Sequence, residues 1–297
     1  MESDAEALWS LVNTPAWLGT VGLLLGLLVG SFLNVVIYRL PRGKSIVYPA
    51  SHCPACQTNI KPWHNVPIVS YLWLRGACSH CGERISLRYP AVELLTGIVF
   101  TLIALRFGFT LETLIFSVFS AGLIVAGLVD IDHQIIPDEI SLGGLVLGLV
   151  AMPCWMISTG QPVASAFYYS LMGALLGGGM LWIVGFTHAR VCVAVGRKFE
   201  HWPGAGEQNP RPSDPDYWMW FPGMGFGDIK LLAMIGAFLG PVGVVTTVML
   251  ASVLGLLLGV GWAAVSKNWN SPFGFGPAIA GAALLSLFLP EPSFLFH

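Results

Sequence analysis

Long apolar runs recur along the whole chain, and they limit its possible folds more than any other feature. A helix needs about 20 apolar residues to cross the hydrocarbon core of a bilayer. The runs cover residues 17–38, 90–107, 112–130, 139–157, 166–186, 229–240, 241–265 and 274–290. Only 10% of the residues are charged, against roughly 25% in soluble domains. We therefore predict an all-α, polytopic membrane protein with about eight transmembrane helices.

Two of these runs need comment. The run 229–240 is short for a span, and only Gly240-Pro241 separates it from the next run. The first run, 17–38, follows an acidic segment without Lys or Arg. A cleaved signal peptide would begin with basic residues and have a shorter apolar core, so we predict that 17–38 is a retained transmembrane helix.

The basic residues indicate how the spans are oriented. With the N-terminus outside, eight spans place thirteen of the fourteen Lys and Arg residues on the cytoplasmic side and leave only Arg106 outside. This is the asymmetry of the positive-inside rule. The same orientation brings Asp130 and Asp228 to the cytoplasmic face. The formal net charge of −2 suggests neither nucleic acid nor an anionic surface as a partner, whereas the apolar composition predicts that the chain lies in membrane lipid.

The composition divides the chain into three predicted regions. Residues 1–38 form an N-terminal tail and the first transmembrane helix, 39–89 a cytoplasmic loop domain, and 90–297 a multi-span membrane domain. Within the last region, 187–222 mixes His, Trp, Pro and charged residues, which is typical of a loop. We expect this segment to be a cytoplasmic insert.

The loop domain carries two C-x-x-C pairs, Cys53-Pro-Ala-Cys56 and Cys78-Ser-His-Cys81. This spacing is close to that of four-thiolate zinc sites. The alternative is two disulfides, but the basic flanks place the loop in the cytoplasm, where thiols stay reduced. We predict that the four cysteines bind zinc and staple the loop domain. With four sulfur ligands no position remains for water, so the metal is structural.

Four other residues bear on this prediction. His52 and His80 lie next to the cysteines and are alternative ligands, although exposed loop histidines without a metal are common. Cys154 and Cys192 have no partner by spacing, and we interpret them as small hydrophobic residues.

Two acids stand at the ends of apolar runs. Asp228, in Gly223-Met-Gly-Phe-Gly-Asp-Ile-Lys230, precedes a run and has two interpretations: a helix N-cap, or a functional acid that the glycines leave open to another segment. Asp130 ends a run, where the helix dipole disfavours negative charge. A carboxylate at Asp130 is therefore costly, which makes it the strongest candidate for a functional acid in its own segment.

Asp130-Ile-Asp-His-Gln-Ile-Ile-Pro-Asp138 contains two further acids. Asp138 follows a proline and precedes a new apolar run, so we predict that it caps a helix. Asp132 is expected to be exposed at the surface.

Together these segments resemble the type IV prepilin peptidases, which are membrane aspartic proteases of the Gly-x-Gly-Asp type with leader peptidase and N-methyltransferase activities. The resemblance spans nearly the whole chain. It rests on 30–41, the paired C-x-x-C, Arg88-Tyr-Pro-Ala-Val-Glu93, 130–138, 223–230 and Phe275-Gly-Pro277. One departure is the segment 187–222, which is longer than the family's usual link.

The resemblance implies a function and a site. The two catalytic aspartates of the family fall on Asp130 and Asp228. The implied methyl donor is S-adenosylmethionine, although no residue pattern identifies its binding site. The implied substrates are prepilins or pseudopilins, cleaved at the cytoplasmic face of the bacterial inner membrane. Neither the oligomeric state nor the roles of the two aspartates as acid and base follow from the sequence.

Two other functions remain open. A transporter or channel can also use intramembrane acids as relays, but it would place them at mid-span and not at span ends. A methyltransferase scaffold without protease activity is the other. For methylation we expect the loop 39–88 to take part, with Glu83, Arg84 and Glu93 as residues to test. Alternatively, the loop is a lid that only guides the leader.

Overall fold

The computed structural model describes residues 6, 9–196, 211–266 and 274–289. Every named element in that part of the chain is helical, as predicted, and its β-bridges are isolated. The α-helices are α2 (Pro15–Arg39), α3 (Val69–Trp73), α4 (Arg88–Phe107), α5 (Leu111–His133), α6 (Asp138–Ser158), α7 (Val163–Ala194), α8 (Pro215–Met219), α9 (Phe226–Ser266) and α10 (Gly276–Ser286). Short 3-10 turns cover Leu40–Arg42 and Pro62–His64.

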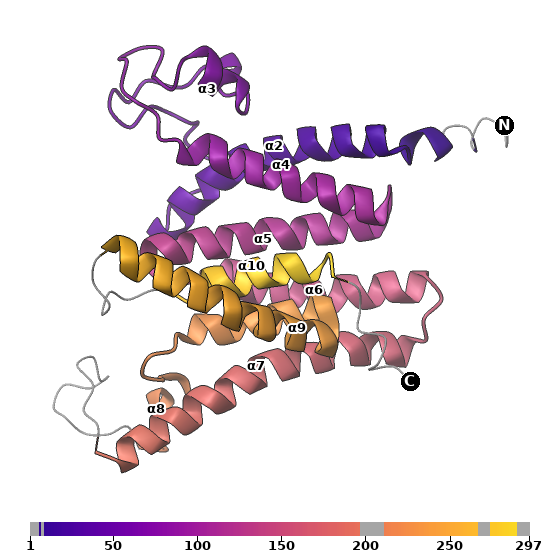
Figure 1. The fold of residues 1–297 in the computed structure, drawn as a ribbon, viewed down its shortest axis with the longest axis vertical. Helices are drawn as coiled ribbons and strands as arrows, with labels where there is room; N and C mark the ends of the chain where they lie inside the picture. Colours follow the sequence, from indigo (N-terminus) through magenta and orange to yellow (C-terminus); the bar gives the residue numbers. More distant parts are fainter. Residues whose placement is uncertain (1–5, 7–8, 197–210, 267–273, 290–297) are drawn as a thin grey trace. The chain divides into compact units, whose positions relative to one another are not determined.

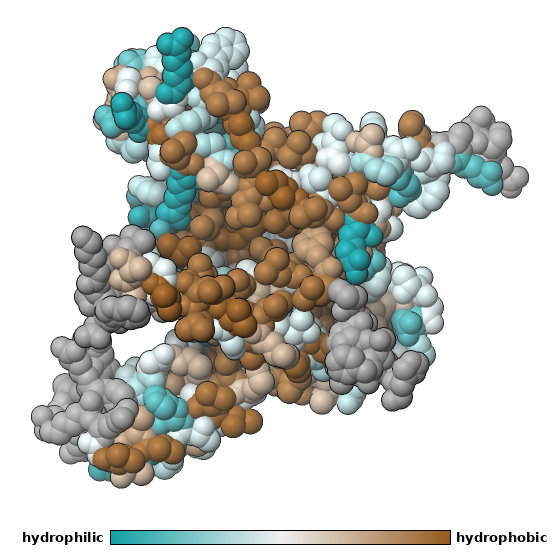
Figure 2. Space-filling model, in the orientation of Figure 1, coloured by the Kyte–Doolittle hydropathy of each residue, from teal (hydrophilic) through white to brown (hydrophobic). Residues whose placement is uncertain are grey.

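Six helices in the described residues are long and apolar enough to cross a membrane, namely α2, α4, α5, α6, α7 and α9. The predicted count of eight is not confirmed. One difference is that the runs 229–240 and 241–265 both lie in α9, and the other is that α10 is only 11 residues long. On the face that Figure 2 shows, the surface over the long helices is mostly hydrophobic, and hydrophilic residues gather around α3.

The chain divides into two compact units, residues 1–125 and 126–297, with the boundary inside α5. The predicted regions 1–38, 39–89 and 90–297 stay predictions. Within each unit, glycines let neighbouring helices approach each other closely.

In the first unit α2 packs along α4 (Figure 1). Gly22, Gly26 and Gly30 are one helical turn apart and face α4. A Cβ atom on Gly26 would lie 2.6 Å from the carbonyl oxygen of Thr96. Only glycine permits this separation, which is the usual means by which membrane helices pack tightly.

In the second unit α9 contacts α6, α7 and α10. The predicted break at Gly240-Pro241 is confirmed, because Gly240 has the non-helical angles φ 65° and ψ −175°. Pro241 has no N–H to give to the carbonyl of Ala237. Ser170 of α7 donates its hydroxyl to that oxygen instead, at 2.9 Å. The kink is therefore stabilised by a hydrogen bond, as apolar surroundings require.

Candidate active site and metal centre

The two acids that the sequence singled out lie in the second unit, and both are buried. Asp130 is in the last turn of α5 and 5% exposed, and Asp228 is in the first turn of α9 and 9% exposed. Their carboxylates interact electrostatically. Two buried acids from distant parts of the chain thus face one site.

Asp130 is held by the start of α10. The backbone N–H of Gly276 donates to Oδ2 of Asp130 at 3.1 Å. A Cβ on Gly276 would lie 2.7 Å from the same oxygen, and one on Gly274 would also overlap the carboxylate. Gly276 of the Phe275-Gly-Pro277 segment, and Gly274 just before it, therefore let a helix N-terminus reach the acid. The sequence contained this segment, but its spacing gave no sign that it meets Asp130.

Asp228 is held within its own helix start. Phe226 is the first residue of α9, so Gly225 precedes the helix and Asp228 is its third residue. The Gly225 amide donates to the Asp228 carboxylate, and the Asp228 amide donates back to Gly225 at 3.1 Å. Asp228 is therefore not the N-cap residue, but it does satisfy a free N–H of the helix start, as an acid at the third position often does. This capping contact and the electrostatic contact with Asp130 coexist.

The loops before and after these acids fit together. Gly223 has φ 82°, a left-handed conformation that glycine adopts without strain. A Cβ on Gly227 would lie 3.1 Å from Ile136. The segment after Asp130 therefore packs directly on the glycines before Asp228, and the two motifs support each other.

The prediction that Asp138 caps α6 is wrong. Pro137 occupies the N-cap position, and no side chain caps this helix. The carboxylate of Asp138 instead forms an ion pair with Lys230 of α9. A charged partner is worth more to an acid than a backbone amide, so the long-range contact prevails over the local preference. Asp132 is exposed, as expected.

An aromatic cluster joins the end of the 187–222 insert to α7. Trp182, Phe186 and Trp218 stack with near-parallel rings, at interplanar angles of 12°, 10° and 5°. The guanidinium of Arg190 lies 3.9 Å from the ring centre of Tyr217. These contacts fix the chain just ahead of Gly223. We did not predict this cluster from the sequence, although Trp182 and Phe186 share a helix face and Tyr217-Trp218 is an aromatic pair. Residues 197–210 of the insert lie outside the described part of the chain.

The four predicted zinc ligands come together in the first unit. Their Sγ atoms all lie within 4.8 Å of one another, and those of Cys53 and Cys81 are 3.8 Å apart. Zinc–sulfur bonds of about 2.3 Å in a tetrahedron place sulfurs about 3.8 Å apart. The cluster therefore has the size that zinc needs. Neither His52 nor His80 belongs to it.

The two C-x-x-C turns have the same geometry. In the first, the backbone carbonyl of Cys53 accepts from the amide of Gln57, and the amide of Cys53 donates to the carbonyl of Thr58. In the second, the backbone carbonyl of Cys78 accepts from the amide of Gly82, and the amide of Cys78 donates to the carbonyl of Glu83. The residue after each pair is left-handed, with φ 58° at Gln57 and 74° at Gly82. Each turn presents two sulfurs to one point, which is the arrangement of a metal-binding knuckle.

The pKa values of the thiols also bear on cation binding. Hydrogen bonds with Thr58 lower the pKa of the Cys56 thiol to about 6, and the amides of Cys81 and His80 lower the pKa of Cys78. A backbone hydrogen bond with Glu83 lowers the pKa of Cys81, but lost hydration and the neighbouring sulfurs raise it to about 12. Four thiols this close all become thiolates only around a metal ion, because a bound metal ion deprotonates its thiol ligands.

Of the remaining cysteines, Cys192 is buried, as expected for a small hydrophobic residue, whereas Cys154 is exposed. Glu83, Arg84 and Glu93, the residues proposed for the methylation region, all line one cavity of the first unit. The structure therefore brings together three residues that the sequence connected only by their place in or beside one loop.

The chain matches two family models. Residues 24–107 match the bacterial peptidase A24 N-terminal domain, and residues 117–260 match the type IV leader peptidase family. No solved structure matches the chain significantly.

Curated relatives cover most of the length. A protein of Pseudomonas putida named prepilin leader peptidase/N-methyltransferase is 36% identical over 302 residues, which cover 92% of each chain. A protein of the same name from Neisseria gonorrhoeae is 34% identical over 86% of this chain and 85% of its own. A type 4 prepilin-like proteins leader peptide-processing enzyme of Escherichia coli is 32% identical over 92% of this chain and 93% of its own. By these matches the chain belongs to the type IV leader peptidase family.

Proposed function

We propose that this protein is a membrane aspartic endopeptidase that removes the leader peptide of type IV prepilins or pseudopilins, and that it then N-methylates the new N-terminal residue. The names of its relatives support both activities. The observation that carries the peptidase activity is the buried, electrostatically coupled pair of Asp130 and Asp228. Asp132, two residues from Asp130, is exposed and so lacks the burial of this pair.

The pair can hydrolyse a peptide without a covalent intermediate. Two buried carboxylates that repel each other cannot both ionise cheaply, so they share one proton. The ionised acid takes a proton from water as the water oxygen attacks the scissile carbonyl carbon. The protonated acid gives its proton to the carbonyl oxygen. When the tetrahedral intermediate collapses, the first acid passes the proton it took from water to the leaving nitrogen and the second takes back the hydroxyl proton, which releases the leader with a carboxyl end and the pilin with a free amine. The amides of Gly276 and Gly225 orient the two carboxylates for these transfers.

The proposed metal is zinc, held by Cys53, Cys56, Cys78 and Cys81. Because all four positions are sulfur, its role is to fold the loops and not to activate water. S-adenosylmethionine is the proposed methyl donor, and when bound it supplies an electrophilic methyl group. The chain must hold that group in line with the new amine.

The proposed location is the bacterial inner membrane, with the site at the cytoplasmic face. The sidedness of Lys and Arg supports this orientation. A prepilin would then present its basic leader to the cytoplasm while its apolar helix stays in the bilayer, next to lipid and this enzyme.

The test is reconstitution of the purified protein in liposomes with a prepilin, followed by mass spectrometry of the products. We expect a leader-free pilin, and a methylated one when S-adenosylmethionine is present. A wild-type protein that leaves the prepilin intact would contradict the peptidase and favour a transporter. If it methylates a pilin that has already lost its leader but cuts none, the methyltransferase scaffold is the correct alternative.

A further inference from the structure

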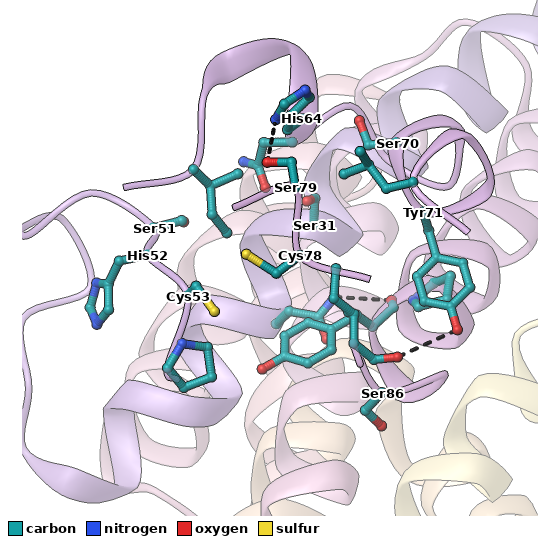
Figure 3. A pocket seen from close by; sticks show the side chains of 18 of the residues that line it. Ser31, Ser51, His52, Cys53, His64, Ser70, Tyr71, Cys78, Ser79 and Ser86 are labelled. Carbon is teal, nitrogen blue, oxygen red and sulfur yellow. Dashed lines mark hydrogen bonds between the residues drawn. The ribbon is translucent and has the colours of Figure 1, made fainter. Parts of the chain in front are cut away.

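A cavity of about 470 Å³ lies in the first unit, where the two C-x-x-C turns meet the ends of α2 and α4 (Figure 3). Cys53 and Cys78 line one side of it, and Tyr71 lines the other. Its volume is within the roughly 300–1,000 Å³ of small-molecule sites. The lining is mostly apolar with a few charged groups, as in such sites.

Two buried charges of opposite sign line the cavity. Arg39 and Glu93 are each 8% exposed. Arg39 donates to the carbonyls of Ser45 and Pro49 at 3.1 and 2.8 Å. Glu93 accepts from the amide of Ile68 at 2.7 Å and from the hydroxyl of Ser31. These partners fix both groups in place but are neutral, so each charge can still attract an opposite charge in the cavity.

A ligand that is complementary to this cavity has an anionic group, a cationic group and a flat ring. A carboxylate suits the guanidinium of Arg39, and an ammonium or sulfonium suits the carboxylate of Glu93. Tyr71 and Tyr89 add aromatic rings to the lining, against which a base can stack.

We infer that this cavity binds the methyl donor, S-adenosylmethionine, and that Arg39 and Glu93 recognise its charged groups. The carboxylate of the donor suits Arg39, its ammonium and sulfonium suit Glu93, and its adenine suits the tyrosine rings. The inference rests on the proposed methyltransferase function and gives it a site. It also assigns a role to the zinc-binding loops, because the two C-x-x-C turns form one wall of the cavity.

Binding can be measured without turnover. Purified full-length protein in lipid nanodiscs is dialysed against tritiated S-adenosylmethionine, with no prepilin present. We expect one donor per chain, displaced by S-adenosylhomocysteine. Glu93→Gln keeps an acceptor for Ile68 but removes the charge, so it should weaken binding about tenfold, as loss of a charged hydrogen bond does. Glu112→Gln, which removes a carboxylate of α5 that does not line the cavity, should bind normally.

A second measurement locates the ligand even if a variant folds poorly. The wild-type protein is photolabelled with an azido-adenine analogue of the donor and digested, and the labelled peptides are sequenced. Label within residues 31–93 is expected, with zinc content as the measure of folding. Label elsewhere, together with normal binding by Glu93→Gln, would overturn the site but leave the methyltransferase proposal standing. A wild type that neither binds the donor nor methylates pilin would overturn the proposed methyltransferase itself.

Discussion

The amide of Gly276 donates a 3.1 Å hydrogen bond to Asp130, although the two residues are 146 positions apart. Gly276 is the first residue of α10, so this amide is one of the free N–H groups at a helix start and lies at its positive end. A carboxylate gains from both the hydrogen bond and the field. The helix α10 is too short to be counted as a span. Its N-terminus instead supports the carboxylate of Asp130.

Gly276→Ala should disable cleavage. The new methyl group would lie 2.7 Å from Asp130 Oδ2, so the carboxylate must move. Since displacement of a reacting group by about 1 Å can cost about a hundredfold in rate, we expect a loss of that order in the initial rate of prepilin cleavage in liposomes.

Gly281→Ala is the matched control, because the same change in the same helix meets only Leu254 Cδ1 at 3.7 Å. It should cleave at the wild-type rate. Equal losses in both variants would mean that α10 acts through packing alone and that the contact with Asp130 is unimportant.

Asp130→Asn and Asp228→Asn should each stop cleavage while the protein stays folded in the membrane. An amide can neither take a proton from water nor supply one, and such general acid–base steps contribute about 10²- to 10⁴-fold. Leader removal is measured at matched protein levels.

The exposed Asp132 provides the control, since Asp132→Asn changes the same residue type two positions from Asp130. It should cleave normally. Near-normal cleavage by either Asp130→Asn or Asp228→Asn would remove the aspartate pair from the mechanism.

Cys53→Ser and Cys78→Ser should lose zinc and unfold the loops between α2 and α4. Binding energy in such sites is largely folding energy, so protease cuts should appear in this segment. Elemental analysis and limited proteolysis measure both effects. Cys154→Ser, outside the cluster, should keep zinc and resist the protease. A wild-type protein without stoichiometric zinc would show that the cysteines serve another purpose.

The sequence predicted the helical architecture, the cysteine cluster, the pairing of Asp130 with Asp228 and the break at Gly240. These features follow from hydropathy, from short spacings or from the family resemblance. Apolar length alone did not predict that two runs would continue as one kinked helix, α9. The kink is stabilised by Ser170, whose contact with Ala237 joins residues 67 positions apart.

The partners of the site residues were not predictable, because each lies far away in the sequence. Asp138 follows a proline at a helix start, where local preference favours capping, yet it pairs with Lys230, 92 positions away. The stacking of Phe186 on Trp218 likewise depends on how the insert returns to α7. Local patterns decide which segments are helices, whereas these contacts depend on which helices meet.

Trp218→Ala should impair cleavage without unfolding the protein. Trp218 stacks on Phe186 at 5.4 Å and holds Pro212 through its indole N–H, so it anchors the segment ahead of Gly223. An aromatic pair is worth about 0.5–1.5 kcal/mol, so cleavage should fall by up to about tenfold. Trp218→Phe, which keeps a stacking ring, should recover most of the rate. If Trp218→Ala cleaves like the wild type, the insert has no role in positioning the site.

Cleavage and methylation should be separable in both directions. In the proposed mechanism, hydrolysis needs Asp130, Asp228 and water, whereas methyl transfer needs a donor held in line with the amine. Asp228→Asn should therefore methylate a pilin whose leader was already removed. Glu93→Gln should cut prepilin normally yet leave most of the product unmethylated, because its carboxylate lies in a different unit from the aspartates.

The products are scored by mass spectrometry at limiting and at excess S-adenosylmethionine, and Glu83→Ala and Arg84→Ala are assayed in parallel. An excess of donor should partly restore methylation by Glu93→Gln, since the defect is in donor binding. A structural defect in the loops would not respond to donor concentration. If all three loop variants lose cleavage and methylation in proportion, the loops only guide the leader, and the donor must bind among the transmembrane helices.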